Sequence, residues 1–525
     1  MPGNEYSQMP TGNTILTNTN SCKGNGSPTL PTRHSVYGCG ETSFTSQLLA
    51  LTLVMALVVS GCAVGPNYKR PAVNAPTDYR GAQVAAQQAS FADLPWWEVF
   101  KDERLRALVQ TALANNYDLR VAITRIEQSR QIAAQARAQY FPFINYSVSG
   151  SDGKNEFAGS VVPNGGQTRG AFVAAASVAW EADVWGKLRR LNESARAQYL
   201  ATEEARRGVM LTLVSDVAQN YFLILGLELQ LDIAKQTTIS YTQTLKLFTQ
   251  RLEGGVSSAL DTSRAAATLA TAAATVPEIE REIALAEDQL SVLMGSNPGE
   301  IAHTAKLLDE IVPPEVPAGL PSALLERRPD VLQAEQLLRS ANAQVGVAQA
   351  NFFPQIGLTA LLGRASSPLS SLSSGQTNVW SVAGNVAGPI FQGGALRAQK
   401  RQAVAFWEQS KLQYEQTALI AFQDVSDALI SRQKYDAIRE KQDEAVQASE
   451  EAVKISLQRY VAGKSSYYEV LEAQQQLFPA QIALAQTELN RRTVIVQLYK
   501  ALGGGWNLKD PDWVGPKSLP SSGTP

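Results

Sequence analysis

Apolar residues near the start of the chain recur with helical spacing. Leu119, Ala122, Ile123 and Ile126 follow the i, i+3, i+4, i+7 pattern of one helix face. Ala and Gln dominate the other faces, which indicates close packing between neighbouring helices rather than a thick globular core. The motif YFP at 140–142 predicts the end of this helix, because proline disfavours helical geometry in the preceding residue.

Strict alternation of apolar and polar residues predicts two β-hairpins, at 143–185 and 355–392. Ile144, Tyr146 and Val148 alternate with polar residues, and the same pattern follows a polar loop in each region. Alternation by itself favours a soluble sheet with one wet face over a sheet in a membrane.

Two long segments without proline, from Gly186 to Val276 and from Ile390 to Phe478, predict long helices. Residues 187–253 could form one helix of about 100 Å at ~1.5 Å per residue. That length does not suit a compact domain, but it suits a hairpin of helices with heptad-like seams. Glycines in LEGGVSSALD and YVAGKSSYYE predict the hairpin tips. A single proline in each return arm, Pro277 and Pro479, predicts a bend about a quarter of the way along it.

The chain contains one unit twice. Asp118 and Pro142 match residues 212 positions later, and the segments around Asp216 and Ser257 match residues 208 positions later. We therefore divide the chain into an N-terminal extension and signal peptide (1–61), a first repeat (62–310), a second repeat (311–507) and a flexible tail (508–525).

The apolar run Leu48–Val59 has the length of a signal-peptide core and is too short to span a membrane. It leads into Ser60-Gly61-Cys62, which resembles a bacterial lipobox, so Cys62 is predicted to carry diacylglycerol and an N-acyl chain. An ordinary signal peptide with an incidental cysteine is the alternative. Ala63, rather than aspartate, favours the outer membrane. The long region before the core suggests that translation starts within 1–47.

Composition gives little support to catalysis, metal binding or nucleic-acid binding. The 525 residues have a formal net charge of −2 and only two histidines, and no pattern joins these to a cysteine. The glycine clusters are not followed by the Lys-Ser/Thr of a nucleotide-binding loop. We expect a protein that is not an enzyme and has no cofactor or metal.

Four predicted strands cannot close a membrane barrel, which needs about eight. Open strand edges in lipid leave backbone groups without hydrogen bonds, at several kcal/mol each. If the hairpins enter a membrane, several chains must share one barrel, of eight, twelve or sixteen strands.

Six blocks in order together resemble the TolC-like outer-membrane factors of bacterial efflux pumps, specifically their NodT-like lipoprotein branch. They are CAVGPNYKRP, WWEVFKDERLRALVQTALANNYDLR, WEADVWGKLRR, RRPDV, GPIFQGGALRA and RYVAGKSSYYEVLEAQ. The resemblance implies a mainly α protein with membrane β structure. It also implies a homotrimer, in which a 12-stranded outer-membrane β-barrel continues into a 12-helix periplasmic α-barrel. Linker 309–321 and the C-terminal segment would form a belt around its waist.

The resemblance also implies a function as a passive conduit. An inner-membrane pump of the RND type, reached through a periplasmic adaptor protein, would supply the energy. One alternative is the same architecture serving a one-step protein secretion system. Another is a coiled-coil lipoprotein that tethers envelope layers, although this leaves the hairpins unexplained.

Gate residues follow from the resemblance at the second tip. Tyr468 and Glu472 are four residues apart and share one helix face, so threefold symmetry would make them an apolar and an acidic ring. Such a carboxylate ring selects cations. Tyr460 and Arg459 would restrain neighbouring helices. The first-repeat equivalents Leu252, Leu260 and Arg264 lack the tyrosines and the carboxylate.

The hairpin tips are also the predicted docking sites for the adaptor. Gly254, Gly255 and Gly463 would permit the close approach of its helices, although helix reversal alone explains these glycines equally well.

Overall fold

The computed structural model describes residues 63–82, 94, 99, 101–153, 169–302, 306–309, 319, 321–374 and 377–504. These lie in one compact unit, Val58–Pro525. The predicted signal peptide, Cys62, most of linker 309–321 and the tail 508–525 lie outside the described residues.

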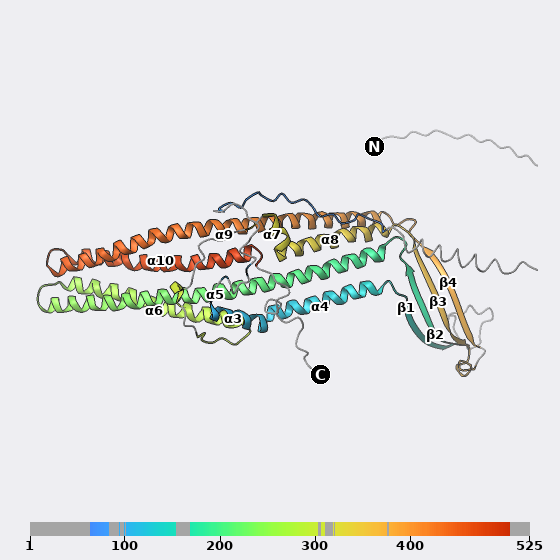
Figure 1. Ribbon diagram of the computed structural model, residues 1–525. Helices are drawn as coiled ribbons and strands as arrows, with labels where there is room; N and C mark the ends of the chain where they lie inside the picture. Colours follow the sequence, from blue (N-terminus) through green and yellow to red (C-terminus); the bar gives the residue numbers. More distant parts are fainter. Residues whose placement is uncertain are drawn as a thin grey trace, which may run out of the picture. The chain divides into compact units, whose positions relative to one another are not determined.

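The described elements repeat in order (Figure 1), and α4, α5 and α6 have the same lengths as α8, α9 and α10. Helices α4 and α8 and strands β1 and β3 begin 212 positions apart, and the long helices begin 208 positions apart, which confirms the duplication. The first repeat contains α3 Glu103–Asn115, α4 Tyr117–Ala138, β1 Phe143–Gly153, β2 Arg169–Ala182, α5 Lys187–Glu253 and α6 Ala259–Leu293. The second contains η3 Leu307–Asp309, α7 Pro321–Arg327, α8 Pro329–Ala350, β3 Gln355–Ser366, η4 Leu369–Ser371, β4 Asn378–Ala387, α9 Ala395–Val461 and α10 Tyr467–Ala501.

Local sequence signals set several helix ends. Asn116 separates α3 from α4: its side-chain oxygen accepts from the Leu119 N–H, and its amide donates to the Leu293 carbonyl at the end of α6. Asp102 caps α3 and also accepts a 2.6 Å hydrogen bond from Tyr221 of α5. These two caps therefore join the start of the first repeat to its long helical hairpin.

The long outgoing helices α5 and α9 have 67 residues each. The return arms α6 and α10 are shorter, at 35 residues each. Gly295 and Gly503 end these arms with positive φ values of 72° and 88°. We predicted each proline about a quarter of the way along its return arm, and this was wrong. Pro277 lies at the middle of α6, and Pro479 lies about a third of the way along α10.

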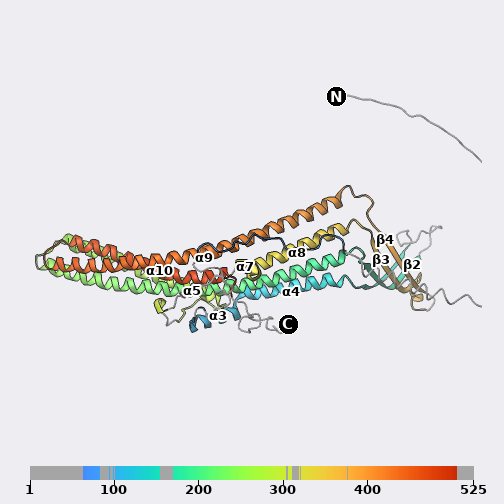
Figure 2. The same cartoon turned by 45° about the horizontal axis from the view of Figure 1, so that its top comes forward.

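Helix contacts give the order of the helical layer. Near the sheet the order is α4–α5–α8–α9, and near the hairpin tips it is α6–α5–α10–α9. The two helical hairpins run side by side in both views (Figures 1 and 2). Helices α4, α6 and α9 therefore each have one side without a helical neighbour among the described residues.

The four strands form one antiparallel sheet in the order β1-β2-β3-β4. One row across it is apolar, through Ile144, Val178, Ala360 and Val382, and the adjacent row through Asn145 is more polar. Ile144 is 73% and Val382 is 76% exposed, and none of the described α-helices packs on the sheet. The prediction that alternation by itself favoured, a soluble sheet with one wet face, is therefore wrong. No described α-helix packs on the apolar face, which is exposed.

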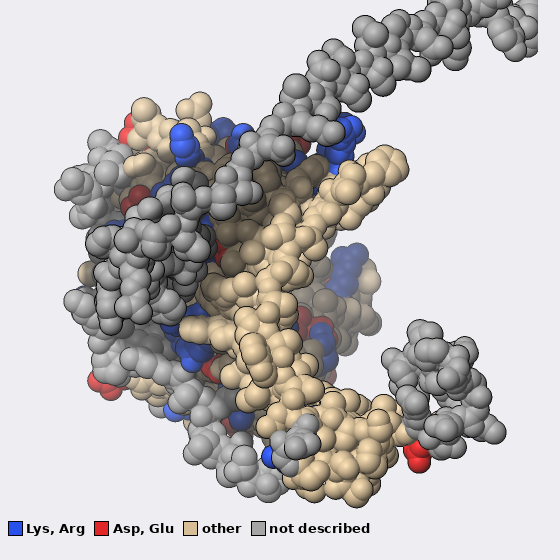
Figure 3. Space-filling model, turned by 90° about the vertical axis from the view of Figure 1, so that its right-hand side faces the viewer, with Lys and Arg blue, Asp and Glu red and all other residues tan. Residues whose placement is uncertain are grey.

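Charged residues are confined to the strand ends. The four strands contain Asp152, Arg169, Glu181 and Arg364, each within the first or last three residues of its strand. The end-on view accordingly shows the sheet as a band nearly without blue or red (Figure 3). Uncharged spans of about nine to eleven residues match the length of a transmembrane strand.

The main core lies where α5 packs on α3, α8 and α10, and it continues onto α9; Tyr221, Tyr414 and Tyr499 are among its largest buried side chains. The most apolar 18-residue window of α5 has a mean hydropathy of 1.4, and 67% of it is buried in the protein. Its apolar character is that of a core helix.

Candidate functional site

The hairpin tips share one turn geometry. At the first tip, Val256 N–H donates to the Arg251 carbonyl and Gly255 N–H to the Leu252 carbonyl, and the second tip repeats this pattern at Lys464 and Gly463. Gly255 and Gly463 have φ values of 73° and 71°, which L side chains rarely adopt. A Cβ at either position would meet nothing within 4 Å. Within the chain, helix reversal accounts for these two glycines, whereas Gly254 has an ordinary φ of −79°.

An aromatic cluster joins the two hairpins just behind the tips, and we call it the tip cluster. It consists of Phe248, Ala265, Tyr460, Tyr467, Val470 and Leu471, all buried. The rings of Phe248 and Tyr460 lie 5.0 Å apart, and those of Phe248 and Tyr467 4.3 Å apart, in edge-to-face arrangements. The cluster therefore couples α5 of the first repeat to α9 and α10 of the second.

Tyr460, a predicted restraint, lies in this cluster with 7% of its surface exposed. The Arg251 guanidinium lies 4.8 Å from its ring centroid, and the hydroxyls of Tyr460 and Ser257 are 3.5 Å apart. Cation–π contacts of this kind contribute about 0.5–2 kcal/mol. Tyr460 thus contacts the first hairpin within its own chain.

Tyr468 and Glu472 are turned by ~100° along α10 from their neighbours Tyr467 and Leu471 and lie outside the tip cluster. Tyr468 is 60% exposed, and Glu472 is also exposed. Their first-repeat equivalents Leu260 and Arg264 are exposed at the same level of α6. The tip therefore presents two pairs of different chemistry, Tyr and Glu on one hairpin and Leu and Arg on the other.

Arg459 lies 3.6 Å from the Glu469 carboxylate, and both side chains are about half exposed. Solvent-exposed pairs of this kind contribute about 0–1 kcal/mol. Arg459 thus joins α9 to the start of α10 in the same hairpin.

Phe248, Arg251 and Tyr467 belong to the tip but were not predicted. Tyr467 could have been found from the apolar spacing of Tyr467, Val470 and Leu471 along α10. Burial raises the pKa of Tyr467 to about 12, and the Asp261 carboxylate adds to this. Its hydroxyl is buried and has no hydrogen-bond partner among the described residues.

The segment that follows Cys62, residues 63–82, is here called the N-terminal strap. At its start, Val64 N–H donates to the Trp185 carbonyl, and Arg190 donates to the carbonyls of Val64 and Gly65 and to the side chain of Asn67. A Cβ on Gly65 would lie 2.5 Å from the Gly346 Cα. The strap thus begins against the junction of β2 with α5 and against α8.

Further along, the strap is held by charge. The buried Glu335 carboxylate of α8 accepts from Tyr68 and pairs with Arg70 at 3.2 Å and with Arg339 at 2.6 Å. Arg70 also donates to the Tyr414 hydroxyl of α9. Cys62 is outside the described residues, but the chain directly after it is tightly docked.

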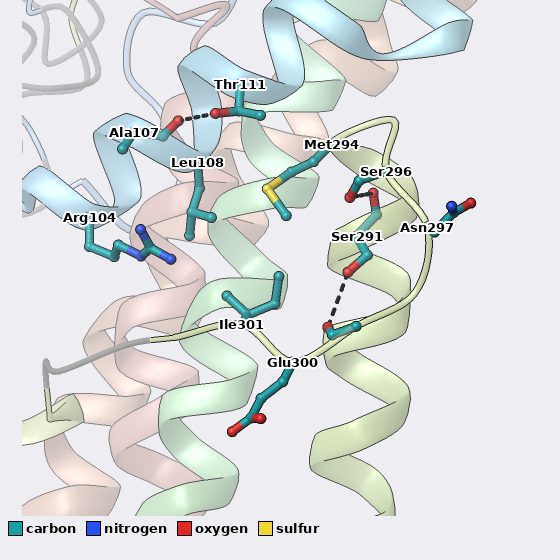
Figure 4. Close-up of a pocket in the computed structure, with 11 residues that line it drawn as sticks. Arg104, Ala107, Leu108, Thr111, Ser291, Met294, Ser296, Asn297, Glu300 and Ile301 are labelled. Atoms are coloured by element: carbon teal, nitrogen blue, oxygen red, sulfur yellow. Dashed lines mark hydrogen bonds between the residues drawn. The ribbon is translucent and has the colours of Figure 1, made fainter.

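A cavity of about 330 Å³ lies between α3 and the segment after α6, where Leu108, Met294 and Ile301 project toward one another (Figure 4). Arg104 and Glu300 supply its only charges, and its lining offers no histidine, cysteine or lysine to activate a hydroxyl. The described residues contain no group of three or more potential metal ligands.

Comparisons with known proteins agree with this arrangement. The outer membrane efflux protein family model matches residues 108–296 and 320–504, one match for each repeat. The probable efflux pump outer membrane protein TtgC of Pseudomonas putida is 35% identical over 88% of this chain and 96% of its own length. The cation efflux system protein CusC of Escherichia coli is 34% identical, over 87% and 98%.

A crystal structure of the open state of the Neisseria gonorrhoeae MtrE outer membrane channel is also similar. Its TM-score is 0.76 at 29% identity, and the match covers 85% of this chain and 98% of that one. The duplicated matches and the relatives that align over nearly their whole length show that the chain belongs to the outer membrane efflux protein family.

Proposed function

We propose that three copies of this chain close into one conduit across the outer membrane and into the periplasm. Each copy would supply four strands to a 12-stranded barrel and four helices, α4, α5, α8 and α9, to a 12-helix barrel. The observation that carries the proposal is that edge strands β1 and β4 and edge helices α4 and α9 lie at matching ends of the chain's two layers. Pairing β4 with β1 of the next copy removes every open strand edge from lipid.

The chain is an outer-membrane component of an efflux system, as are its relatives. We infer that it conducts small molecules passively. An inner-membrane pump of the RND type supplies the energy, and a periplasmic adaptor joins that pump to the tips. The relatives' names, which describe efflux rather than protein secretion, support this choice over the secretion alternative.

The adaptor is proposed to dock at the tips, beside Gly254, Gly255 and Gly463. Gly255 and Gly463 have open space where a side chain would stand. A helix of a partner could therefore approach the backbone closely there.

The gate is proposed to lie at the same end, at Tyr468 and Glu472. Both are exposed within one chain, while Tyr460 is held in the tip cluster. Three copies would place three Glu472 carboxylates around the axis. Tyr460 and Arg459 would hold the hairpins in the closed arrangement.

Cys62 is proposed as the lipid anchor, with diacylglycerol and an N-acyl chain. The docked N-terminal strap supports this, because it places the residue after Cys62 beside the junction of sheet and helices. Intact-mass measurement of the purified protein, and of the Cys62→Ala variant, tests the anchor independently of the pore.

The test of the conduit is the mass and conductance of the detergent-purified protein. Light scattering should give three times the chain mass, and planar bilayers should show discrete single-channel steps. A particle of one chain, or a trimer that never conducts under voltage, would overturn the proposal. The same measurements on the Cys62→Ala variant separate the two proposals, because that variant lacks the anchor and should still form a conducting trimer.

A further inference from the structure

The first turns of α9 carry positive charge that no carboxylate of the described residues balances. Arg397 and Arg401 are exposed, Lys400 is half-buried, and none of the three makes an ion pair within the described part of the chain. From Gln336 to Trp407 the sequence contains no Asp or Glu. The neighbouring parts of α8, β3 and β4 therefore cannot supply a counter-charge.

The same junction in the first repeat is neutralised. There Asp183 pairs with Arg189 at 3.2 Å and also caps the N-terminus of α5 by accepting from the N–H groups of Leu188 and Arg189. With the offset of 208 positions, Arg189 corresponds to Arg397 and Asp183 to Phe391. The second repeat has thus kept the cation and replaced the carboxylate with an aromatic ring.

The second junction is also uncovered. A Cβ on Gly186 would lie 2.6 Å from the Ala63 Cα of the N-terminal strap, whereas one on Gly394 would meet nothing within 4 Å. Ile390 is 103% and Phe391 is 87% exposed. No side chain caps the N-terminus of α9.

A second copy of the chain would not neutralise this charge. The proposed trimer places α9 beside α4 of the next copy, and residues 128–151, which include the end of α4 and most of β1, contain no Asp or Glu. At ~100° per residue, Arg397 lies roughly 120–160° around α9 from the glutamines that line a cavity with α8, and Arg401 lies roughly 80–160° from them. Arg397 is thus directed away from that cavity, and Arg401 lies to one side of it.

The position of the β4–α9 junction relative to the membrane indicates which kind of ligand it would bind. Strand β4 ends at Ala387, at the end of an uncharged span of transmembrane length, so α9 begins at the level of the lipid headgroups. Cations beside exposed aromatic and aliphatic side chains at that level suit a phosphate group attached to acyl chains.

We propose that Arg397 and Arg401 bind the phosphate of an anionic phospholipid of the periplasmic leaflet, with Phe391 and Ile390 against its glycerol and upper acyl chains. The inference goes beyond the conduit but uses its geometry, in which the lipid lies at the seam between copies. Lys400 adds to the local positive potential.

Native mass spectrometry of protein from vesicles of phosphatidylethanolamine, with or without phosphatidylglycerol, tests the proposal. The wild type should retain phosphatidylglycerol in preference to phosphatidylethanolamine. The double variant Arg397→Gln/Arg401→Gln should retain at least about tenfold less phosphatidylglycerol than the wild type, because it loses two charge-assisted contacts with the phosphate. The control Lys246→Gln/Lys464→Gln removes two exposed positive charges near the tips and should retain the wild-type amount.

Equal retention by the double variant and the wild type would overturn the proposal, as would a wild type without preference for phosphatidylglycerol. Displacement by inorganic phosphate at matched concentration would also overturn it, in favour of a free-phosphate site. A particle of one chain that still retains phosphatidylglycerol through Arg397 and Arg401 would sink the trimer but leave the lipid site standing.

Discussion

At the scale of residues, the tip separates tyrosines that look alike in the sequence. Tyr460 and Tyr467 face Phe248 in the tip cluster, while Tyr468 faces outward. The difference arises because α10 turns successive residues by ~100°, so that neighbours cannot share a face. The buried tyrosines hold the two hairpins together, whereas Tyr468 remains exposed.

The exposed charges Glu472 and Arg264 at the tip predict that their substitutions have opposite effects on ion selectivity. Glu472→Gln should lower the preference for cations in single-channel recordings, and Arg264→Gln on the other hairpin should raise it, because each removes one sign of charge at one level. Reversal potentials in a salt gradient measure both. Shifts of the same sign in the two variants, or none, would contradict the gate assignment.

The environment of the Tyr467 hydroxyl predicts that the protein tolerates its removal. Because this buried group has no hydrogen-bond partner in the part of the chain that the structure describes, Tyr467→Phe should be neutral or stabilising by up to about 1 kcal/mol. Tyr467→Ala should cost about 3–5 kcal/mol through the cavity that it leaves. Protease digestion of the tips, followed over urea concentration, distinguishes the two. A large loss in the phenylalanine variant would show that the hydroxyl is needed.

At the scale of elements, a buried carboxylate joins α9 to α10. Glu488 has 7% of its side chain exposed and pairs with Arg492 at 2.7 Å, Arg439 at 2.9 Å and Arg491 at 3.0 Å. Burial alone would raise its pKa, but the hydrogen bonds from Arg492 and Arg439 outweigh this, so the pKa of Glu488 is lowered. Its contribution is present above the usual carboxyl pKa of about 4.3 and is lost as pH falls through the lower folded value.

We therefore expect Glu488→Gln to lower stability at pH 7 by about 3 kcal/mol and to reduce its loss in acid. Urea midpoints between pH 3 and pH 7 measure both effects. Glu444→Gln, which removes an exposed partner of Lys441, is the control and should change little. A variant that loses stability in acid as steeply as the wild type would exclude Glu488 as the titrating group.

The alternation of the sheet predicts a contrast between adjacent residues of β4. Val382 lies in the apolar row and Ser381 in the more polar one. Val382→Lys should cost about 2–4 kcal/mol in lipid and block assembly, whereas Ser381→Lys should assemble and change conductance. Heat-resistant trimer on gels and single-channel recording test the pair, and equal assembly of both would contradict the assigned faces.

Sequence patterns gave the element order, the bounds of α5 and the repeat offsets, because proline, glycine and periodicity are local signals. The lengths of the return arms did not follow, since two glycines at positive φ end them early. Alternation alone could not decide whether the sheet is soluble or lies in a membrane. The decision required the structure, in which no described α-helix packs on the sheet. Tyr467 could be assigned to the tip cluster only once Phe248 was placed between the hairpins.

At the scale of the whole molecule, the open edges α4 and α9 make a single chain incomplete. Leu412 and Leu419 are exposed on α9, and Val121 and Ile132 are exposed on α4. Counted from the sheet, Leu412 and Val121 lie at the same level, 17 residues from the near ends of their helices. A seam between copies would bury them together.

Leu412→Asp should weaken each seam by about 2 kcal/mol or more, because it removes apolar burial and adds an unpaired charge. Sedimentation of the purified variant should show single chains, while Leu412→Met should remain assembled. An intact trimer with aspartate at this position would place the seam elsewhere.

The N-terminal strap also constrains the order of folding. It is synthesised early, yet its partners Glu335, Asn342 and Tyr414 lie 267, 276 and 344 residues further along the chain than the residues they bind. Loops of that length close slowly. Docking of the strap can therefore be complete only after Tyr414 of α9 has emerged, so a docked strap reports that synthesis has reached into α9.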